Sequence, residues 1–478
     1  MSVTALNRAE EGSVPFRVAG SVATGTILLP LNSTMIAIAI VAIAAQFGSS
    51  AAVSWLIPAL YIATAVTAPL AGRLGALLGA RRVYLTGLAL VAIASGVGTF
   101  APNVGWLIAA YAILGIGISA HFPNAMTMIR GYADRYGNQP RTGIMIIAIC
   151  GQSTAMFGPS VGGLLVGTFG WQSIMWINLP AAAFSALAVT RFADVGFVGG
   201  TALSRRALLR SLDLAGNVLF LGLITTTMVF LLSLSADPVW WLIPVMSVLL
   251  WAFIARERSA DEPLIDVRAL SANRALSATL GRSMLCYVVF YIVFLGLPQW
   301  LQHARGMTPL QTGLTMLPLA AIAICSTMVA SHVYRRFGAR PTLATGMGAV
   351  VAGGLLLALV ERSTAPVIVL LLVAAALGIP NSFNNFGNQA VINSVTSVDE
   401  IGVATGMYRT AQFIGASLAA VVLHVTTAGQ AIDDAGLNRT GWVVVSIGAV
   451  LLTGVLLSRH MPARHTGAIH LANSHGST

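Results

Sequence analysis

Lysine is missing from this chain of 478 residues, and all 26 basic residues are arginines. The absence excludes a phosphate-binding loop of the Gly-Lys-Ser/Thr type, because that loop needs a lysine ammonium beside the phosphates. ATP-driven transport by this chain alone is therefore not expected.

Charge of either sign is scarce. Charged residues make up 9% of the chain, whereas soluble proteins carry about 25%. Hydrophobic residues make up 56%, and the mean hydropathy is +0.83. This composition is typical of a polytopic membrane protein. The net charge of +11 can indicate nucleic-acid binding, but the arginines stand in short loops between apolar runs. Membrane orientation explains that placement, so no nucleic-acid partner is expected.

Cysteine is also rare. Cys150, Cys286 and Cys325 all stand inside apolar runs, which argues against a disulfide framework, and no Cys/His spacing reads as a zinc site. We expect no metal, no cofactor and no enzymatic activity. The first apolar run is too long, and too weakly preceded by positive charge, to be a cleaved signal peptide.

Long apolar runs dominate what is present, and a bilayer crossing takes roughly 20 residues. The runs predict an all-α membrane protein with about fourteen spans, at 19–46, 52–74, 82–100, 104–128, 142–168, 171–192, 212–234, 238–255, 275–302, 309–333, 341–360, 365–392, 401–426 and 440–459. By our assignment, 21 arginines fall on one side of these spans and three on the other. The positive-inside rule then places both termini in the cytoplasm of a cell (inner or plasma) membrane.

An internal repeat divides the chain. Gly79-Ala80-Arg81-Arg82 with Thr86-Gly87 recurs as Gly338-Ala339-Arg340-Pro341 with Thr345-Gly346. Each copy follows the second span of a six-span group. We predict a six-helix half at 1–200, a two-helix insertion with flanking loops at 201–262, a second six-helix half at 263–462 and a disordered cytoplasmic tail at 463–478. Parallel halves with a site between them at the midplane are a transporter plan.

The central motif of the sequence is a group of glycine and proline residues that weakens the helix of the fifth predicted span. Pro159 removes a backbone hydrogen bond, and Gly158 and Gly162 share one helix face that lets a neighbour approach closely. Gly163 extends the motif. Helix packing is one interpretation, and a flexible contact between two moving halves is the other. On the second, Gly158→Leu is expected to abolish transport.

The segment Gly158-Pro159-Ser-Val-Gly162-Gly163 resembles the antiporter motif of the major facilitator superfamily. Trp171-Gln-Ser-Ile-Met-Trp176-Ile177-Asn178-Leu179-Pro180, Pro263-Leu264-Ile265-Asp266 and Pro298-Gln299-Trp300-Leu301-Gln302 are similar to its fourteen-span drug:proton antiporter branch. The resemblance covers nearly the full length. It implies a rocker-switch fold with spans 1, 4, 9 and 12 around a central cavity. In the cytoplasmic loop motif Gly72, Gly79, Arg81 and Arg82 fit.

Three positions depart from that family's pattern. Asn32, just before Ser33, stands where the family usually has an aspartate in the first span. Ala76 stands where the family's loop motif usually has an aspartate. Tyr111 stands where the family's fourth span usually has an arginine. No carboxylate stands in a span interior, although burial of such a group is the usual means of proton coupling. The remaining coupling candidates are His121 and the loop-edge Asp213. A lone His is more often a packing residue.

Asn32, Ser33 and Tyr111 are candidate ligand-binding residues. A stripe of asparagines and a stripe of aromatic residues supply further candidates. Asn381, Asn384, Asn385 and Asn388 share one face of the twelfth span, where they either bind neighbouring helices or line the cavity. Tyr287 and Tyr291, with Phe294, follow the same spacing in the ninth span and suit flat ligands, although core packing is an equal alternative.

Arg282 and Arg409 are the full charges within spans. They either reach back to the interface or face the cavity, where they favour neutral or anionic ligands over permanent cations. We therefore expect a monomeric secondary transporter of small amphipathic drugs or metabolites, with the bilayer, a small-molecule substrate and protons as its partners. The alternatives are a facilitative or anion-preferring transporter without proton coupling, and a non-transporting membrane sensor or partner protein.

Overall fold

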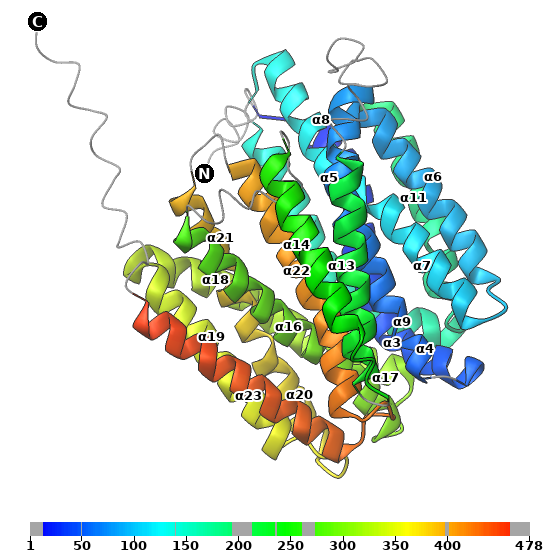
Figure 1. Cartoon of the computed structure of the whole chain (residues 1–478), viewed down its shortest axis with the longest axis vertical. Coiled ribbons are helices and arrows are strands. Elements are labelled where there is room, and N and C mark those ends of the chain that lie inside the picture. The colour runs from blue at the N-terminus through cyan, green and yellow to red at the C-terminus, as the bar shows by residue number, and fades with distance from the viewer. Residues whose placement is uncertain are drawn as a thin grey trace, which may run out of the picture.

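The computed structural model describes residues 13–48, 50–138, 140–193, 213–234, 237–260, 273–396 and 401–458. Within these ranges the regular structure is helical (Figure 1). The motif at Pro263–Asp266, the predicted tail and most of both connectors around the insertion lie outside the described residues.

The N-terminal group of helices runs from Phe16 to Phe192. Its members are α2 (Phe16–Thr26), α3 (Leu28–Phe47), α4 (Ser50–Val53), α5 (Leu56–Leu78), α6 (Ala80–Thr99), α7 (Val104–Ser119), α8 (His121–Tyr136), α9 (Arg141–Phe169), α10 (Ser173–Trp176) and α11 (Asn178–Phe192).

A helical pair and a C-terminal group follow. The pair is α13 (Leu214–Ser233) and α14 (Leu242–Ser259), and the C-terminal helices are α16 (Arg274–His303), α17 (Pro309–Thr315), α18 (Leu317–Phe337), α19 (Ala339–Leu359), α20 (Val367–Leu377), α21 (Ile379–Val395), α22 (Ile401–Thr426) and α23 (Asp434–Leu457).

Ten helical segments of the described chain are long and apolar enough to cross a membrane, or eleven with the bent helix α9. A shorter apolar segment, Ala215–Leu231, lies in α13. Helices α14 and α22 occupy the other two predicted spans. The all-α membrane architecture is thus confirmed, while the count of fourteen spans stays a prediction.

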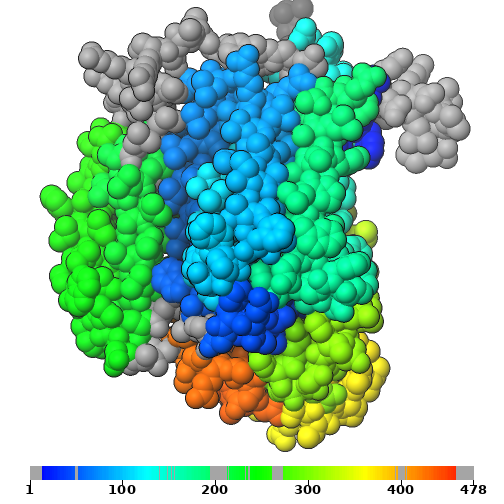
Figure 2. All heavy atoms as spheres, turned by 90° about the vertical axis from the view of Figure 1, so that its right-hand side faces the viewer, coloured from blue at the N-terminus to red at the C-terminus, as the bar shows by residue number. Residues whose placement is uncertain are grey.

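Each group packs mainly within itself. In the N-terminal group α3 lies against α9 and α7 against both α5 and α6, and in the C-terminal group α19 lies against α23 and α16 against α22. The groups meet where α3 contacts α16, α5 contacts α22 and α9 contacts α17 and α18. Helices α13 and α14 pair with each other, and α13 contacts α5 and α22, so the pair forms one flank of the molecule (green in Figure 2).

Large apolar side chains cover the outer helix faces. Phe184 is 64% exposed, Leu187 68%, Trp251 72% and Val450 67%. Such residues on a water-exposed surface form aggregation-prone patches, but they match the hydrocarbon of a bilayer, where the helices satisfy their own backbone hydrogen bonds.

Helix α9 is bent by 48° between Thr142–Ala155 and Phe157–Phe169. Pro159 stands just after the bend, within the helix. Proline lacks the N–H that the preceding turn needs and its ring pushes against that turn, which bends helices at such positions. The sequence motif therefore coincides with a change of direction in the helix that contacts the opposite group.

Candidate transport site

The glycine motif of α9 makes two different contacts. The face with Gly158 and Gly162 lies against Thr34 and Met35 of α3, within the same group, so closely that a Cβ on Gly158 would overlap the Thr34 side chain. A Cβ on Gly163 would instead overlap the carbonyl oxygen of Pro309, at the start of α17 in the opposite group. The two interpretations of the motif thus apply to different glycines: Gly158 and Gly162 pack α9 within its own group, and Gly163 lies at the contact with the opposite group.

Ser160 and Gly313 complete this contact. The Ser160 hydroxyl donates a hydrogen bond of 2.9 Å to the Gly313 carbonyl, and a Cβ on Gly313 would lie 2.8 Å from the Pro159 carbonyl oxygen. Small residues on both sides thus let the backbones of α9 and α17 touch.

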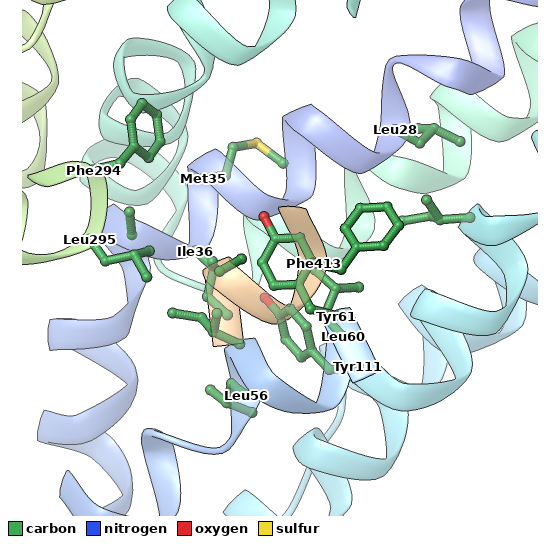
Figure 3. Close-up of a cluster of buried hydrophobic side chains, with 14 of the residues drawn as sticks. Leu28, Met35, Ile36, Leu56, Leu60, Tyr61, Tyr111, Phe294, Leu295 and Phe413 are labelled. Carbon is green, nitrogen blue, oxygen red and sulfur yellow. The ribbon is translucent and has the colours of Figure 1, made fainter. Parts of the chain in front are cut away.

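An aromatic cluster joins the two groups of helices near the middle of the molecule. We define it as Tyr61 of α5, Tyr287 and Tyr291 of α16, and Phe413 of α22. The Tyr61 and Tyr291 hydroxyls are hydrogen-bonded at 2.5 Å, and the Tyr61 ring stacks on Phe413 with centroids 5.8 Å apart. Figure 3 shows Tyr61 and Phe413 side by side, with Tyr111 close to Tyr61.

Tyr287 and Tyr291 thus lie where the aromatic stripe predicted them, while Tyr61 and Phe413 were missed. Their only signal is that each is an aromatic residue on a span. The pairing of α5 with α22, which brings them together, is not visible in either helix's own sequence.

The asparagines of the stripe on α21 have different surroundings. Asn388 accepts a hydrogen bond of 2.6 Å from the Arg282 Nε, and Asn385 accepts one of 2.8 Å from the Tyr408 hydroxyl. Asn384 is buried against Gly346 of α19, and Asn381 is half-buried. The stripe therefore binds neighbouring helices through at least two of its members, and the partly exposed Asn385 and Asn381 remain the candidates for contact with a ligand.

Asn32 binds a neighbouring helix. Its amide and that of Asn178 on α11 exchange two hydrogen bonds of 2.8 Å each, and Asn32 is only 2% exposed. Ser33 is buried and donates to the Pro30 carbonyl at 3.1 Å. Tyr111 is fully buried among apolar side chains, and its hydroxyl has no hydrogen-bond partner in the described chain. In this conformation none of the three offers an open polar group to a ligand.

His121 lies inside the N-terminal group. It is 1% exposed, its ring packs edge-on against Tyr84 at 4.8 Å, and neither ring nitrogen has a partner among the described residues. The Tyr84 hydroxyl donates instead to the Val22 carbonyl at 2.8 Å. His121 is thus enclosed by α2, α6 and α8, away from the aromatic cluster.

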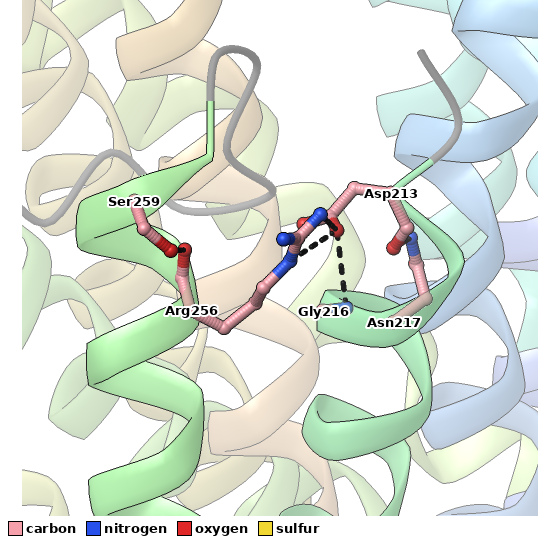
Figure 4. A network of polar contacts seen from close by, with 5 residues as sticks. All are labelled: Asp213, Gly216, Asn217, Arg256 and Ser259. Atoms are coloured by element: carbon pink, nitrogen blue, oxygen red, sulfur yellow. Dashed lines mark hydrogen bonds and ion pairs between the residues drawn. The ribbon is translucent and has the colours of Figure 1, made fainter. Parts of the chain in front are cut away.

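Asp213 has a structural role at the start of α13. Its carboxylate accepts from Arg256 of α14 at 2.7 Å and from the Gly216 backbone N–H at 3.3 Å, as Figure 4 shows. The carboxylate therefore caps α13 and joins it to α14.

The cytoplasmic loop motif also packs helices together. Gly79 has a φ of +97° between α5 and α6, a conformation that favours glycine. Arg81 donates a hydrogen bond of 2.6 Å to the Thr190 carbonyl near the end of α11. A Cβ on Gly72 would lie 3.4 Å from Pro123 of α8. Arg82 belongs to the same first turn of α6.

Comparison with known proteins decides the family. The sequence profile of the Major Facilitator Superfamily matches residues 22–420. The chain belongs to this superfamily. The resemblance seen in the motifs is confirmed, and the chain is a multi-span membrane transporter.

Relatives and solved structures agree with the superfamily assignment. The uncharacterized MFS-type transporter YwoD of Bacillus subtilis is 32% identical over 91% of this chain and 95% of its own length. The tetracenomycin C resistance and export protein of Streptomyces glaucescens is 28% identical over 94% of this chain and 84% of its own length. Several further relatives are named as antibiotic or multidrug resistance proteins. The crystal structure of the nucleoside transporter NupG shares the fold, with a TM-score of 0.63 at 14% identity, covering 92% of this chain and 98% of that chain.

Acidic and basic residues of the described chain occupy different places along its helices. The buried carboxylates of the described chain, Asp213, Glu257 and Glu361, stand at helix ends or in a loop. Arg282 and Arg409 lie within α16 and α22, beside the aromatic cluster. That these two arginines set the electrostatics of a ligand site stays a prediction.

A hollow lies between the halves of this transporter, at the ends of α3, α5, α16 and α22. It has a volume of about 140 Å³, and Gln299, His303 and His424 are among its polar lining residues. No group of three His, Cys, Asp or Glu side chains able to hold a metal ion occurs in the described part of the chain.

Proposed function

We propose that this transporter exports small amphipathic compounds, drugs or metabolites, by alternating access of its two halves. The observation that carries the proposal is the aromatic cluster, because rings from both halves meet there through the Tyr61–Tyr291 hydrogen bond. Flat aromatic walls with a few polar groups suit amphipathic ligands. The chain moves its substrate as a monomer and does not convert it chemically.

The relatives support export as the direction. Those named for antibiotic resistance or export match most of this chain. A site between two halves moves a ligand across the membrane when the halves rock about it. The arginine-rich helix ends then face the cytoplasm, with both termini.

The packing fits a site closed to the outside. On this orientation, the Gly163–Pro309 approach, the Ser160–Gly313 hydrogen bond and the 3.1 Å hydrogen bond from Gln302 to the Ile38 carbonyl all lie toward the outer ends of their helices. A compound entering from the cytoplasm then reaches the aromatic cluster and stops at this barrier until the halves rock.

Proton coupling is the step with the least support from the residues present. Asn32 stands where the family usually has an aspartate, and an amide cannot titrate. The absence of any carboxylate from a span interior favours, as a second candidate, a facilitative or anion-preferring transporter without proton coupling. If protons are exchanged, His121 or a proton carried by the substrate itself remains as the route, since Asp213 is held by Arg256.

Inside-out membrane vesicles test the function. An anionic dye and a cationic dye are supplied to the same vesicles with and without an imposed pH gradient, and vesicles lacking the protein give the background. We expect uptake of the anionic dye to exceed that of the cation, and Tyr61→Ala to abolish it while Tyr136→Ala, at an exposed ring, retains it.

The outcomes separate the candidates. Uptake that ignores the pH gradient identifies the facilitative alternative. No uptake of either dye by folded protein, with a second protein co-purifying, identifies a sensor or partner subunit. Gradient-driven cation uptake that survives His121→Ala contradicts the role given to the missing carboxylate.

A further inference from the structure

Arg409 of α22 lies at the junction of the two halves. It is half-buried, and its guanidinium carbon sits 4.7 Å from the ring centroid of Phe122 on α8, in the opposite half. Its one hydrogen bond in the described chain runs from Nη1 to the Gln412 Oε1 at 3.3 Å. A guanidinium carries five N–H donors, so most of the hydrogen-bonding capacity of Arg409 is unused.

Gln412 adds a further donor at the same place. Gln412 is 4% exposed, and its Oε1 is committed to Arg409, which fixes the direction of the amide. The Nε2 lies beside the Tyr408 hydroxyl but makes no hydrogen bond of good geometry in the described chain. A buried N–H group without a well-aligned acceptor is destabilising, so this donor is available to an acceptor on a ligand.

No carboxylate of the described residues pairs with either cation, Arg409 or Arg282. Among the described residues Arg409 forms no ion pair, and Arg282, on α16 beside Tyr408, is bound by the neutral side chains of Asn388 and Thr279. A cation in the membrane interior is normally paired or faces a wet cavity. Two cations, several free donors and no carboxylate together call for an anion.

The aromatic cluster borders this group of donors. Phe413 of the cluster stands one helical turn after Arg409 on α22, and α22 packs along α16, which carries Tyr287 and Tyr291. The rings of Tyr287 and Tyr291 have centroids 6.3 Å apart. A flat ligand lying against these rings would therefore place a substituent at one of its edges next to Arg409.

We propose that Arg409 and Gln412 form an anion-binding subsite, which selects planar aromatic compounds bearing a carboxylate or a comparable acidic group. The ligand's ring system lies against Tyr287 and Tyr291, and its anionic oxygens accept from the Arg409 guanidinium and the Gln412 Nε2. This subsite rests on the proposed transport function and specifies its substrate class.

The contact with Phe122 gives the subsite a link to transport. The guanidinium that binds the anion is also the group that packs on the opposite half, and a cation over an aromatic face is attracted to the ring. Oxygens of a bound anion draw the guanidinium away from the ring, so loading the subsite weakens a contact between the halves.

Binding of three matched probes to the purified full-length protein in lipid nanodiscs tests the subsite. Pyrenecarboxylate, pyrenemethanol and pyrenemethylammonium share one ring system and differ in charge, and empty nanodiscs correct for partition into lipid. We expect the wild type to bind the carboxylate at least tenfold more tightly than the ammonium. Arg409→Gln should weaken carboxylate binding about tenfold or more, with the alcohol changed less than twofold.

The second variant adds a negative charge to the subsite. Gln412→Glu places a carboxylate beside Arg409, so it should expel the anionic probe and admit the ammonium. Arg439→Gln, at an exposed helix position, is the matched control and should change nothing. Thermal unfolding of each variant establishes that it is folded.

Each outcome decides a different claim. If Arg409→Gln loses affinity equally for all three probes, or loses none, the anion subsite is overturned. The proposed aromatic site is then not contradicted. Equal affinity of the wild type for all three probes has the same two consequences. Failure of the wild type to bind any of them counts against both the subsite and the proposed function.

Discussion

Glu361 is a buried carboxyl in the loop between α19 and α20. It is 3% exposed, and neither of its carboxylate oxygens has a hydrogen-bond donor in the described chain. Burial raises its pKa to about 8, with the Arg305 guanidinium acting in the opposite direction. Arg305 itself donates to the backbone carbonyls of Ser363 and Ala365, which hold this loop against the end of α16. At neutral pH Glu361 is therefore largely protonated.

Stability should consequently depend on pH through Glu361. An acid whose pKa is higher in the folded than in the unfolded state binds a proton on folding. Stability is then greatest below the unfolded pKa of about 4.3 and falls until the pH reaches the folded value. Glu361→Gln should abolish this decline and raise the unfolding temperature above pH 8, measured by thermal unfolding in detergent across pH 5–9. A wild type with the same pH profile as the variant contradicts the buried, neutral carboxyl.

The pair Asn32–Asn178 is the second feature at the scale of single residues. Asn32→Leu leaves the Asn178 amide buried without its partner, and hydrogen bonds between membrane helices contribute up to about 1.7 kcal/mol. We expect each single variant to lose about 1–2 kcal/mol of unfolding free energy and the double Leu variant to lose less than the sum. Strictly additive losses in this double-mutant cycle would show that the two amides do not interact.

The same pair shows what residue patterns leave open. An amide in a span must face protein or water because lipid cannot satisfy it, and the sequence analysis made Asn32 a candidate ligand-binding residue. Which helix supplies the partner depends on how α3 packs against α11, and neither sequence contains that information. The same holds for Tyr61 and Phe413, which are brought together by the packing of α5 on α22.

The positions of the helices along the chain were more predictable than the partners against which they pack. The apolar run at 275–302 corresponds to α16 at Arg274–His303, and the run at 341–360 to α19 at Ala339–Leu359, because length and hydropathy alone define a span. The interruptions were not predicted. The fourth span is divided at Ala120 into α7 and α8, and the twelfth at Gly378 into α20 and α21. Neighbouring helices can satisfy the backbone groups at such breaks, and hydropathy does not register them.

Helix α9 offers a test of the contact between halves with its own control. Gly163→Ala places a Cβ against the Pro309 carbonyl of the opposite half, whereas Gly167→Ala, one turn later, meets Leu310 at an ordinary 3.5 Å. We expect Gly163→Ala to reduce dye uptake several-fold with near-normal unfolding temperature, because it forces the halves apart without disturbing either one. Gly167→Ala should transport normally.

Two results would contradict that interpretation. Normal uptake by Gly163→Ala would show that this approach is not required in the transport cycle. An equal loss in both variants would assign the effect to α9 itself rather than to the contact with α17.

At the scale of the whole molecule, the division into two six-helix halves stays a prediction from the internal repeat. The repeated turns begin α6 and α19, at Ala80 and Ala339, one in each group. The association of the groups could not be predicted, because it depends on a few close approaches at α3, α5 and α9. The insertion α13–α14 lies outside this arrangement, and α13 contacts both groups.

The contacts that we propose close the outer side are built from neutral groups. Gly163 meets a backbone carbonyl, Ser160 donates to another, and Gln302 to a third. Counter-ions screen interactions between charges over about 10 Å at 0.1 M salt. They have little effect on contacts between uncharged groups such as these. The activation barrier for opening outward should therefore be insensitive to ionic strength. A tenfold rise in salt should leave the opening rate unchanged in single-molecule fluorescence of dyes on the outer ends of α9 and α17. The transporter could then keep the same turnover in dilute and in saline surroundings, with its salt response confined to the capture of charged substrate.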